Sequence, residues 1–455
     1  MNHTIFRTIY AKLILCLLLV ILSDILLYYQ PIGWNIAVFA STLFISILLR
    51  NGRNANSYSI NSRILIFLSS ILILSLYENI SILSIAMNLI ALITISLSDN
   101  KKWQLNSIEW LIRVRKFFLS SWLSLFNDIL NYRSLNATKQ LNKVSLLRSW
   151  TLPIFVSLGF VLMFYDANPI IYRFLNKISF ADELNKISFK RFFYWILVAS
   201  LCWKLIRVRI TIVKSRLRFI PRKALYSAYS YLFIKDSIFK SLIIFNIMFF
   251  TQNVMDVKYL WIKSEIPEGL SIAQYAHKGA YTLVITAILA GLFSILCLKS
   301  DGAKLTKWLI NLWITQNIFL VISSIWRVLL YIDSYSLTYL RSAALIWMAI
   351  VALGLLFIII RITYNKSSIW LLNINIITVL SVLYLSCFVN FGYFISNYNV
   401  NSSIEKSGNC KGLDVFYLQR IGISSLPAIN NALRNIDVNS REYRQLIYIR
   451  NNLED

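Results

Sequence analysis

LRSAALIWMAIVALGLLFIIIRIT, residues 340–363, carries charge only at Arg341 and Arg361, near its two ends. An apolar run of this length predicts a helix that crosses the hydrocarbon core of a bilayer, which takes about 20 apolar residues. Blocks of the same kind recur on both sides of it along the chain. The sequence therefore predicts a fold decided by membrane-spanning helices.

The composition of the whole chain agrees with this prediction. The 455 residues are 58% hydrophobic and only 15% charged, and the mean hydropathy is +0.63. A soluble protein could not cover so much apolar surface without associating. We expect an all-α, polytopic transmembrane helical bundle of about eleven spans. The candidate spans are residues 10–29, 34–50, 64–77, 80–97, 150–166, 191–206, 238–257, 279–299, 308–331, 340–363 and 370–396.

The spacing of these spans divides the chain into four regions. They are an N-terminal four-span transmembrane region (1–97), a cytoplasmic amphipathic basic loop (98–148), a seven-span transmembrane core (149–396) and a small helical extracytoplasmic tail (397–455). No connection between spans is long enough for a kinase, an ATPase or a nucleotide-binding module. The chain is therefore expected to act through its membrane helices or its tail.

The tail carries its own helix signals. Residues 412–421 predict a short amphipathic helix, and residues 440–453 predict a charged one. Ser424 and Ser425 precede Leu426-Pro427, a pattern typical of a helix start with proline in the first turn.

The distribution of charge predicts the orientation. The net charge is +26. With the N-terminus placed inside, the predicted inside segments hold 29 Lys and Arg residues and the predicted outside loops hold 10. The positive-inside rule then predicts a cytoplasmic N-terminus and an extracytoplasmic C-terminus in a bacterial inner membrane. The expected partner is the lipid bilayer; no nucleic acid is expected, because no basic loop shows a recognition motif.

Two basic segments each have two interpretations. Residues 103–132 repeat apolar side chains at helical spacing, which fits a helix lying on the cytoplasmic leaflet or a helix packed on the membrane domain. Residues 204–223 concentrate Lys and Arg, which fits binding of anionic lipids or a loop that only directs topology.

Motifs for catalysis, metals and cofactors are missing from the sequence. The chain has two histidines, His3 and His277, and five cysteines with no CxxC pair. Polyhistidine metal sites, HExxH chemistry and phosphate-binding glycine loops are excluded at the level of sequence. We therefore predict no catalytic residue, no metal and no cofactor.

Polar side chains within the predicted spans and in the outer connections beside them are the remaining site candidates, because such groups are costly inside a bilayer. They are predicted to bind a ligand and comprise Asn246, Gln252, Asn253, Asp256, Tyr275, His277, Gln316, Asn317, Arg327, Asp333 and Arg341. Asp256 and Arg327 should share one depth near the outer surface, so we expect Arg327 to pair with Asp256 or with Asp333. Such a pair can lock helices together, or the cluster can form an outward-facing polar vestibule.

Three classes of function remain open. The first is transport or ligand binding through the vestibule. The second is a non-catalytic envelope protein that binds a partner through its tail; the identity of such a partner is not encoded in any motif. The third is a membrane-embedded enzyme acting on a lipid-linked substrate, for which His277 with Asp256 or Glu268 is the one plausible acid–base set.

Several long blocks suggest a family. FNIMFFTQNVMDVKYLW (245–261), AQYAHKGAYTLVITAILAG (273–291) and LDVFYLQRIG (413–422) are the most distinctive of them. Over residues 150–435 the chain resembles the uncharacterised bacterial membrane family known as domain of unknown function 4173. This resemblance implies a multi-pass membrane protein and implies no particular activity.

Overall fold

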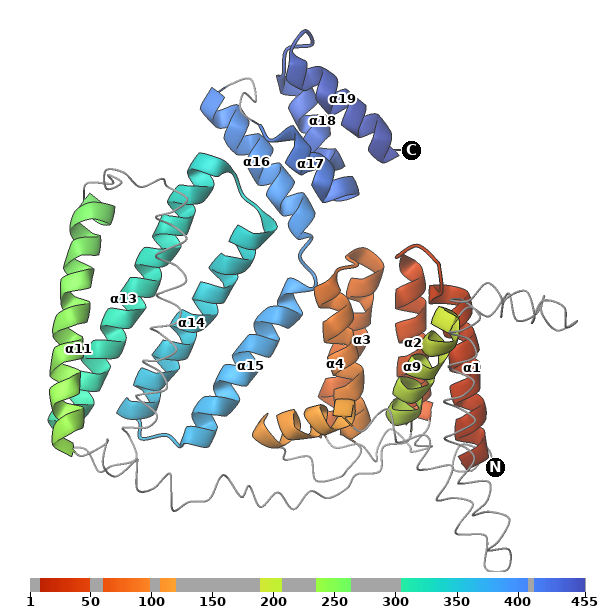
Figure 1. The fold of residues 1–455 in the computed structure, drawn as a ribbon, viewed down its shortest axis with the longest axis horizontal. Helices are drawn as coiled ribbons and strands as arrows, with labels where there is room; N and C mark the ends of the chain where they lie inside the picture. Colours follow the sequence, from red (N-terminus) through yellow and green to blue (C-terminus); the bar gives the residue numbers. More distant parts are fainter. Residues whose placement is uncertain are drawn as a thin grey trace, which may run out of the picture. The chain divides into compact units, whose positions relative to one another are not determined.

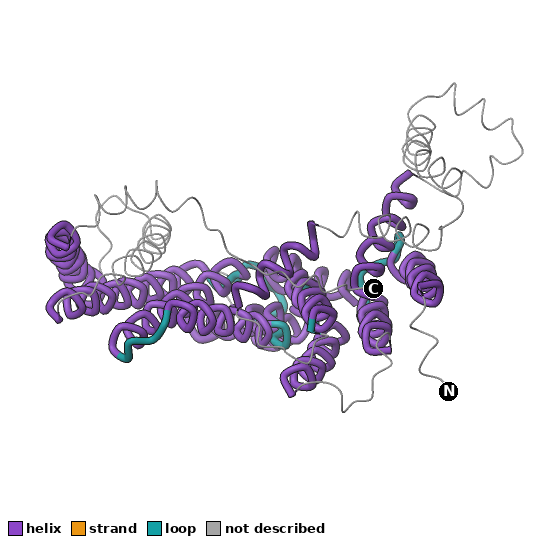
Figure 2. Tube along the Cα trace, turned by 90° about the horizontal axis from the view of Figure 1, so that it is seen from below, coloured by secondary structure: helices purple, strands orange, loops and turns teal. Residues whose placement is uncertain are grey.

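A computed structural model describes residues 9–49, 60–98, 107–119, 189–206, 235–262, 304–407 and 413–454. Every regular element in these ranges is a helix (Figure 2). Five of the described helices are long and apolar enough to cross a membrane, and two more, α2 (Trp34–Leu49) and α4 (Ile82–Leu97), are apolar but shorter. This fits a helical membrane protein. The count of eleven spans stays a prediction, and the expected spans at 150–166 and 279–299 lie outside the described residues.

The chain divides into two compact units. Unit 1 comprises Met1–Val213 and Leu383–Phe388, and unit 2 comprises Lys214–Val382 and Val389–Asp455. Each unit has its own buried apolar core, so each is described by itself.

Unit 1 is built from five named helices (Figure 1). They are α1 (Ile9–Leu27), α2 (Trp34–Leu49), α3 (Ile60–Glu78), α4 (Ile82–Leu97) and α9 (Phe189–Ile206). Their shared core holds Leu43, Ile93 and Trp203, each less than a tenth exposed. The α3–α4 connection is short because Ser81 starts α4 with a capping box, in which its hydroxyl accepts from Ser84 N and its own N–H donates to Ser84 Oγ.

A further helix of unit 1, residues 107–119, tests part of the amphipathic segment. Phe117 is buried in the core of unit 1. The indole of Trp110 donates a hydrogen bond of 3.1 Å to Thr94 Oγ1 of α4. This part of the segment therefore packs on the helices of unit 1. Residues 120–132 and 207–223 lie outside the described residues.

Unit 2 begins with a row of four helices that follow one another in Figure 1. They are α11 (Lys235–Asp256), which continues into a π-helix η3 (Val257–Ile262), then α13 (Lys304–Tyr335), α14 (Tyr339–Thr363) and α15 (Ser368–Ser386). The last four residues of α15 belong to unit 1. Leu242, Ile314 and Leu355 lie in their common core. Thr338 caps α14, its hydroxyl accepting from Arg341 N. The connections turn sharply at Ser336 and Asn365, both with positive φ.

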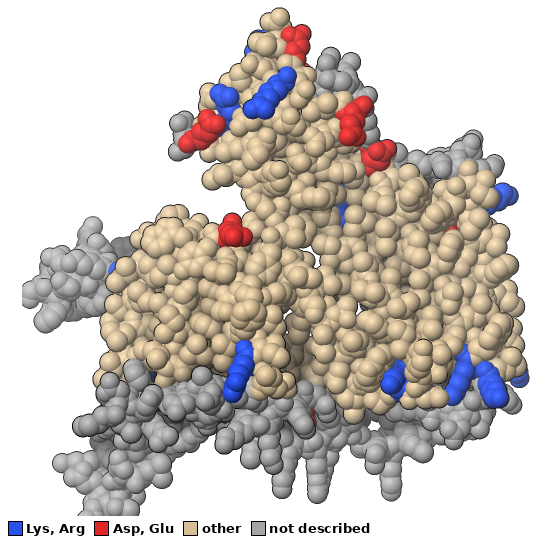
Figure 3. All heavy atoms as spheres, turned by 180° about the vertical axis from the view of Figure 1, so that it is seen from behind, with Lys and Arg blue, Asp and Glu red and all other residues tan. Residues whose placement is uncertain are grey.

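The two ends of this row differ in charge. The end where α11 and α13 begin and α14 finishes carries six basic residues and one acid among the described residues, namely Lys235, Asp236, Lys240, Lys304, Lys307, Arg361 and Lys366. Figure 3 shows Lys and Arg side chains gathered at the end of unit 2 away from the C-terminal residues 413–454. The opposite end carries the acids Asp256 and Asp333 as well as basic residues.

The last predicted span, residues 370–396, is wrong as a single helix. α15 ends at Ser386, and a separate helix α16 (Phe391–Ser407) begins five residues later. Asn390 starts α16, because its Oδ1 accepts from Tyr393 N and its carbonyl accepts from Phe394 N. The residues that follow, such as Asn397, Asn399 and Asn401, are polar and leave the apolar pattern.

The tail forms a small helical cluster within unit 2. After α16 come α17 (Val415–Ile421), a 3-10 turn η4 (Gly422–Ser425), α18 (Leu426–Asn435) and α19 (Arg441–Glu454). Their core includes Val400, Ile429 and Leu446. The predicted helices near 412–421 and 440–453 are thus confirmed. Ser425 precedes α18 as expected, but its hydroxyl donates to Leu418 O and Gly422 O instead of capping the helix.

Hydrogen bonds fasten the tail to the α13–α14 connection. The amide of Asn399 bonds to both backbone groups of Leu337, accepting from its N–H at 2.7 Å and donating to its carbonyl at 2.9 Å. Tyr339 N donates to the hydroxyl of Tyr417 at 2.9 Å. Asn399 and Leu337 are both buried. The tail is therefore held at the end of α13 and α14 that lies opposite the basic end of unit 2.

Candidate functional site

Seven of the eleven predicted polar residues meet along the contact between α11 and α13, together with Asn311, which was not predicted. We call this contact the polar seam, made of Asn246, Gln252, Asn253 and Asp256 from α11 with Asn311, Gln316, Asn317 and Arg327 from α13. The two helices pack side by side over most of their length (Figure 1).

The expected ion pair is present at one end of the polar seam. Arg327 Nη2 donates to Asp256 Oδ1 at 2.5 Å. Gln252 Nε2 donates to the same oxygen at 3.0 Å. The side chains of Arg327 and Asp256 are only 6% and 3% exposed. Such a pair holds two helices together, because removing either partner leaves a buried charge uncompensated.

A change in helical form accompanies the pair. Asp256 is the last residue of α11, and the π-helix starts with the next residue. Trp261 in this π-helix donates from Nε1 to Ser323 Oγ at 3.2 Å. Its ring stacks on Trp326, with centroids 5.5 Å apart. π-turns recur at functional sites, and here the turn brings Trp261 onto the face of α13 that carries Arg327.

The amides of the polar seam bond mainly to backbone carbonyls. Asn246 Nδ2 donates across to Leu309 O at 3.1 Å, and Asn253 Nδ2 donates to Gln316 O at 3.4 Å. Asn317 donates within its own helix to Trp313 O. Buried acceptor atoms remain without a hydrogen-bond partner along the described seam, namely Asn246 Oδ1, Asn253 Oδ1, Asp256 Oδ2, Asn311 Oδ1 and Gln316 Oε1. These oxygens are suited to water or a cation.

Two other predicted site residues, Asp333 and Arg341, do not join the seam. Asp333 is exposed at the end of α13. Arg341 donates to the carbonyls of Tyr335 and Ser336 and stacks over the ring of Tyr331, 3.9 Å from its centroid. Arg341 thus caps the C-terminus of α13. Tyr275 and His277 lie outside the described residues, so the acid–base set stays a prediction.

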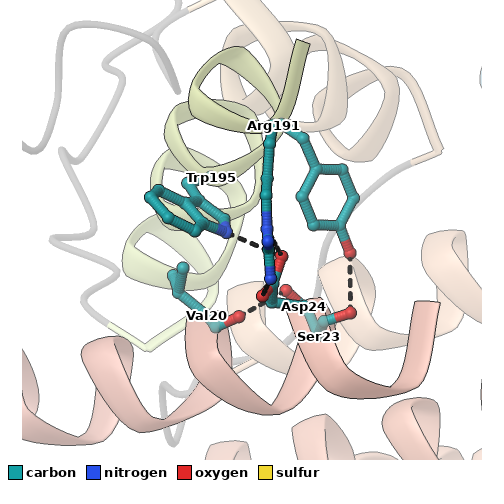
Figure 4. A network of polar contacts seen from close by, with 6 residues as sticks. Val20, Ser23, Asp24, Arg191 and Trp195 are labelled. Carbon is teal, nitrogen blue, oxygen red and sulfur yellow. Dashed lines mark hydrogen bonds and ion pairs between the residues drawn. The ribbon is translucent and has the colours of Figure 1, made fainter. Parts of the chain in front are cut away.

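Unit 1 contains a second interhelical ion pair that sequence reasoning missed (Figure 4). Arg191 of α9 bonds to both carboxylate oxygens of Asp24 on α1, with Nε at 2.9 Å from Oδ1. Trp195 Nε1 donates to Asp24 Oδ1 at 2.9 Å, and Tyr194 donates to Ser23 O. The guanidinium also lies 5.2 Å from the ring of Tyr28. A signal existed: Asp24 is the one acid in the first predicted span, and Arg191 opens the sixth.

A groove between α17 and α19 is the second candidate site, which we call the tail groove. Its volume is about 620 Å³, and its described lining includes Phe416, Gln419, Arg441, Arg444, Gln445 and Tyr448. Phe416 and Tyr448 are 74% and 66% exposed. None of the described lining residues is acidic. The groove thus combines positive charge with two aromatic walls.

A family model describes nearly the whole chain. Residues 5–432 match the model described as Domain of unknown function (DUF4153). The chain belongs to this family.

The DUF4153 match corrects the family expected from the sequence blocks, which was domain of unknown function 4173. It also reaches the first four predicted spans, which the resemblance over 150–435 did not cover. It ends within α18, so the DUF4153 model includes the α17 wall of the tail groove and not the α19 wall. Neither the curated proteins nor the solved structures contain a match to this chain.

Proposed function

We propose that this DUF4153 protein is a non-catalytic membrane protein that binds an acidic peptide segment in the tail groove, on the outer side of the membrane. The observation that carries the proposal is the groove itself, with Arg441 and Arg444 beside Phe416 and Tyr448. The family assignment and the apolar helices support the membrane part of the proposal.

The chemistry of the groove favours one kind of occupant. Two exposed arginines without an acidic neighbour in the described lining attract carboxylates, and arginine binds carboxylates with two hydrogen bonds. Exposed aromatic rings give large contact areas for apolar side chains. Gln419 and Gln445 can bond to a peptide backbone. An extended peptide segment that places an acidic residue next to an apolar one can contact the arginines, the aromatic rings and the glutamines together.

The attachment of the tail supports a binding role. Asn399 and Tyr417 fasten the tail to the α13–α14 connection, and the ion pair of Asp256 with Arg327 fastens α11 to α13. A rigidly held groove loses less conformational freedom when a ligand binds. We infer that the helices of unit 2 serve as the anchor of the groove.

The orientation completes the proposal. Six basic residues and one acid of the described chain lie at the end of unit 2 opposite the tail, which agrees with the higher Lys and Arg count of the predicted inside segments. We therefore propose a cytoplasmic N-terminus, an extracytoplasmic tail and a bacterial inner-membrane location.

A binding titration tests the proposal on the full chain in nanodiscs. The probes are two labelled nine-residue peptides, one alternating Glu and Phe and the other alternating Lys and Phe. We expect the Glu–Phe peptide to bind more tightly, and the double change Arg441→Glu and Arg444→Glu to weaken its binding at least about tenfold.

The matched control carries Arg420→Glu and Arg434→Glu, the same charge change on exposed tail residues outside the described lining. It should bind the Glu–Phe peptide like the unmodified chain. Equal losses in both double variants, or equal binding of the two peptides, would contradict a specific groove.

The unpartnered oxygens of the polar seam favour a second candidate function, binding of a cation or a transported ion through the vestibule. Thermal unfolding in sodium chloride and in choline chloride tests it. A sodium-specific rise of the unfolding midpoint that disappears in Asn253→Leu would support the seam as a cation site. The same midpoint in both salts would exclude sodium binding there.

A further inference from the structure

Arg361 is a buried cation at the basic end of unit 2. It lies in the last turn of α14 and is only 7% exposed. Its Nη2 donates to Ser368 Oγ at 2.8 Å, whereas Nη1 is buried without a hydrogen-bond partner. No carboxylate among the described residues pairs with it. Arg361 therefore differs from Arg327 and Arg191, each of which has an aspartate partner.

A buried guanidinium without a counter-charge is strongly unfavourable, because its lost hydration is not replaced. The other two interhelical arginines show how this chain compensates such a charge when the partner is internal. At Arg361 no acid among the described residues takes this place, which points to an anion from outside the chain.

The surroundings of Arg361 are suited to such an anion. Ser368 is the first residue of α15, a helix of 19 residues whose first backbone N–H groups carry partial positive charge. Lys366 is exposed in the connecting turn. Lys307 reaches the same turn from α13, donating to Asn365 Oδ1 at 3.2 Å. Two lysines and one arginine thus lie in or contact the turn that leads into the N-terminus of α15.

We propose that this turn, which we call the inner turn (Arg361 to Ser368 with Lys307), binds a phosphate group. Arginine and helix N-termini both favour phosphate oxygens, and a leaflet surface supplies phosphate at the depth where α14 ends. The source is either the headgroup of an anionic phospholipid or free phosphate in the adjoining aqueous phase. This site is independent of the tail groove, at the other end of the helices of unit 2.

Thermal unfolding of the full chain in nanodiscs tests the proposal. The nanodiscs contain phosphatidylcholine alone or phosphatidylcholine with phosphatidylglycerol. We expect phosphatidylglycerol to raise the unfolding midpoint of the unmodified chain and to raise that of Arg361→Gln much less. In phosphatidylcholine alone, Arg361→Gln should be at least as stable as the unmodified chain, because it removes the uncompensated charge.

The matched control is Lys240→Gln, which removes an exposed positive charge from the same end of unit 2 but not from the inner turn. Phosphatidylglycerol should raise the unfolding midpoint of Lys240→Gln as much as it raises that of the unmodified chain. A second arm adds inorganic phosphate to phosphatidylcholine nanodiscs. If inorganic phosphate raises the unfolding midpoint of the unmodified chain but not that of Arg361→Gln, free phosphate is the source. If only phosphatidylglycerol raises the midpoint of the unmodified chain, the lipid headgroup is the source.

The proposal is overturned if Arg361→Gln and the unmodified chain respond equally to both additions. Should Arg361→Gln fail to fold, Ser368→Ala keeps the charge and removes one hydroxyl of the site. Native mass spectrometry should then show about tenfold weaker retention of phosphatidylglycerol. Retention equal to that of the unmodified chain would overturn the proposal as well.

Discussion

Asp256 accepts a hydrogen bond of 2.5 Å from Arg327, and this buried ion pair joins α11 to α13. Unit 1 repeats the device with Asp24 and Arg191, which join α1 to α9. Asp24 lies in the last turn of α1, and Asp256 is the last residue of α11. Each unit therefore contains an interhelical charge pair beside its apolar core.

Breaking the first pair should destabilise unit 2. Arg327→Ala leaves Asp256 as a buried charge, which costs about 3–5 kcal/mol in comparable sites. Adding Asp256→Ala should restore part of that loss, since the orphaned charge is removed. Chemical or thermal unfolding of the full chain in detergent measures both. Lys258→Ala, an exposed charge in the next turn, is the neutral control; losses that simply add in the double variant would argue against coupling.

Weakening the second pair should open the contact between α1 and α9. Cys202 is fully buried in this contact, and Cys16 lies 3.5 Å from Ala199 O. In a chain whose only cysteine is Cys202, Asp24→Ala should raise the rate of maleimide labelling about tenfold, because hydrogen bonds to a charged group are lost.

Asp24→Asn is the graded comparison for that experiment. Its side-chain oxygen can still accept from Trp195 Nε1, so its labelling rate should lie between those of the unmodified chain and Asp24→Ala. Identical rates in all three chains would mean that the pair does not hold the helices together.

Removing the amide of Asn399 should loosen the tail. Asn399→Ala leaves the buried N–H and C=O of Leu337 without partners, at a cost of about 1–3 kcal/mol for each group. Hydrogen exchange of α16–α19 amides should accelerate. Glu405→Ala, at an exposed position of the same helix α16, should not change it. Unchanged exchange in Asn399→Ala would show that the tail is held by other contacts.

Adding one methyl group at Gly392 should disturb the same junction. A Cβ there would lie 2.7 Å from Tyr339 Oη and 2.8 Å from Ser424 Cβ. Gly392→Ala should therefore destabilise the chain by about 1–3 kcal/mol, as overpacking does. At Gly33 the nearest atom would be 3.7 Å away, so Gly33→Ala should be nearly neutral in the same unfolding measurement.

The sequence predicted the features that depend on a single helix and on the depth of its residues in the membrane. Helical spans follow from local hydropathy, and the pairing of Arg327 with Asp256 follows because both residues should share a depth where an unpaired charge is costly. The helices of the tail follow from local signals at Pro427 and in residues 440–453.

Features that depend on packing could not be predicted in this way. Asp24 and Arg191 are 167 positions apart, and depth alone does not say that α1 contacts α9. The tail groove arises only when α17 packs near α19. The end of α15 was missed because apolar residues such as Cys387 and Phe388 continue the hydropathy pattern past Ser386. The sequence showed Arg361 only as one of the basic residues of a predicted inside segment. Its burial could not be predicted, because it results from the packing of the helices around it.

The central claim is that the helices of unit 2 cross the membrane and present the tail on the side opposite the inner turn. Cysteine labelling tests it most directly, in a chain whose native cysteines are replaced by serine. Asn439→Cys reports on the tail, and Tyr364→Cys, at a position 69% exposed, reports on the inner turn. In intact cells, a membrane-impermeant maleimide should label Asn439→Cys, and Tyr364→Cys only after lysis. Labelling of both positions on the same side, or the reverse order, would contradict the account.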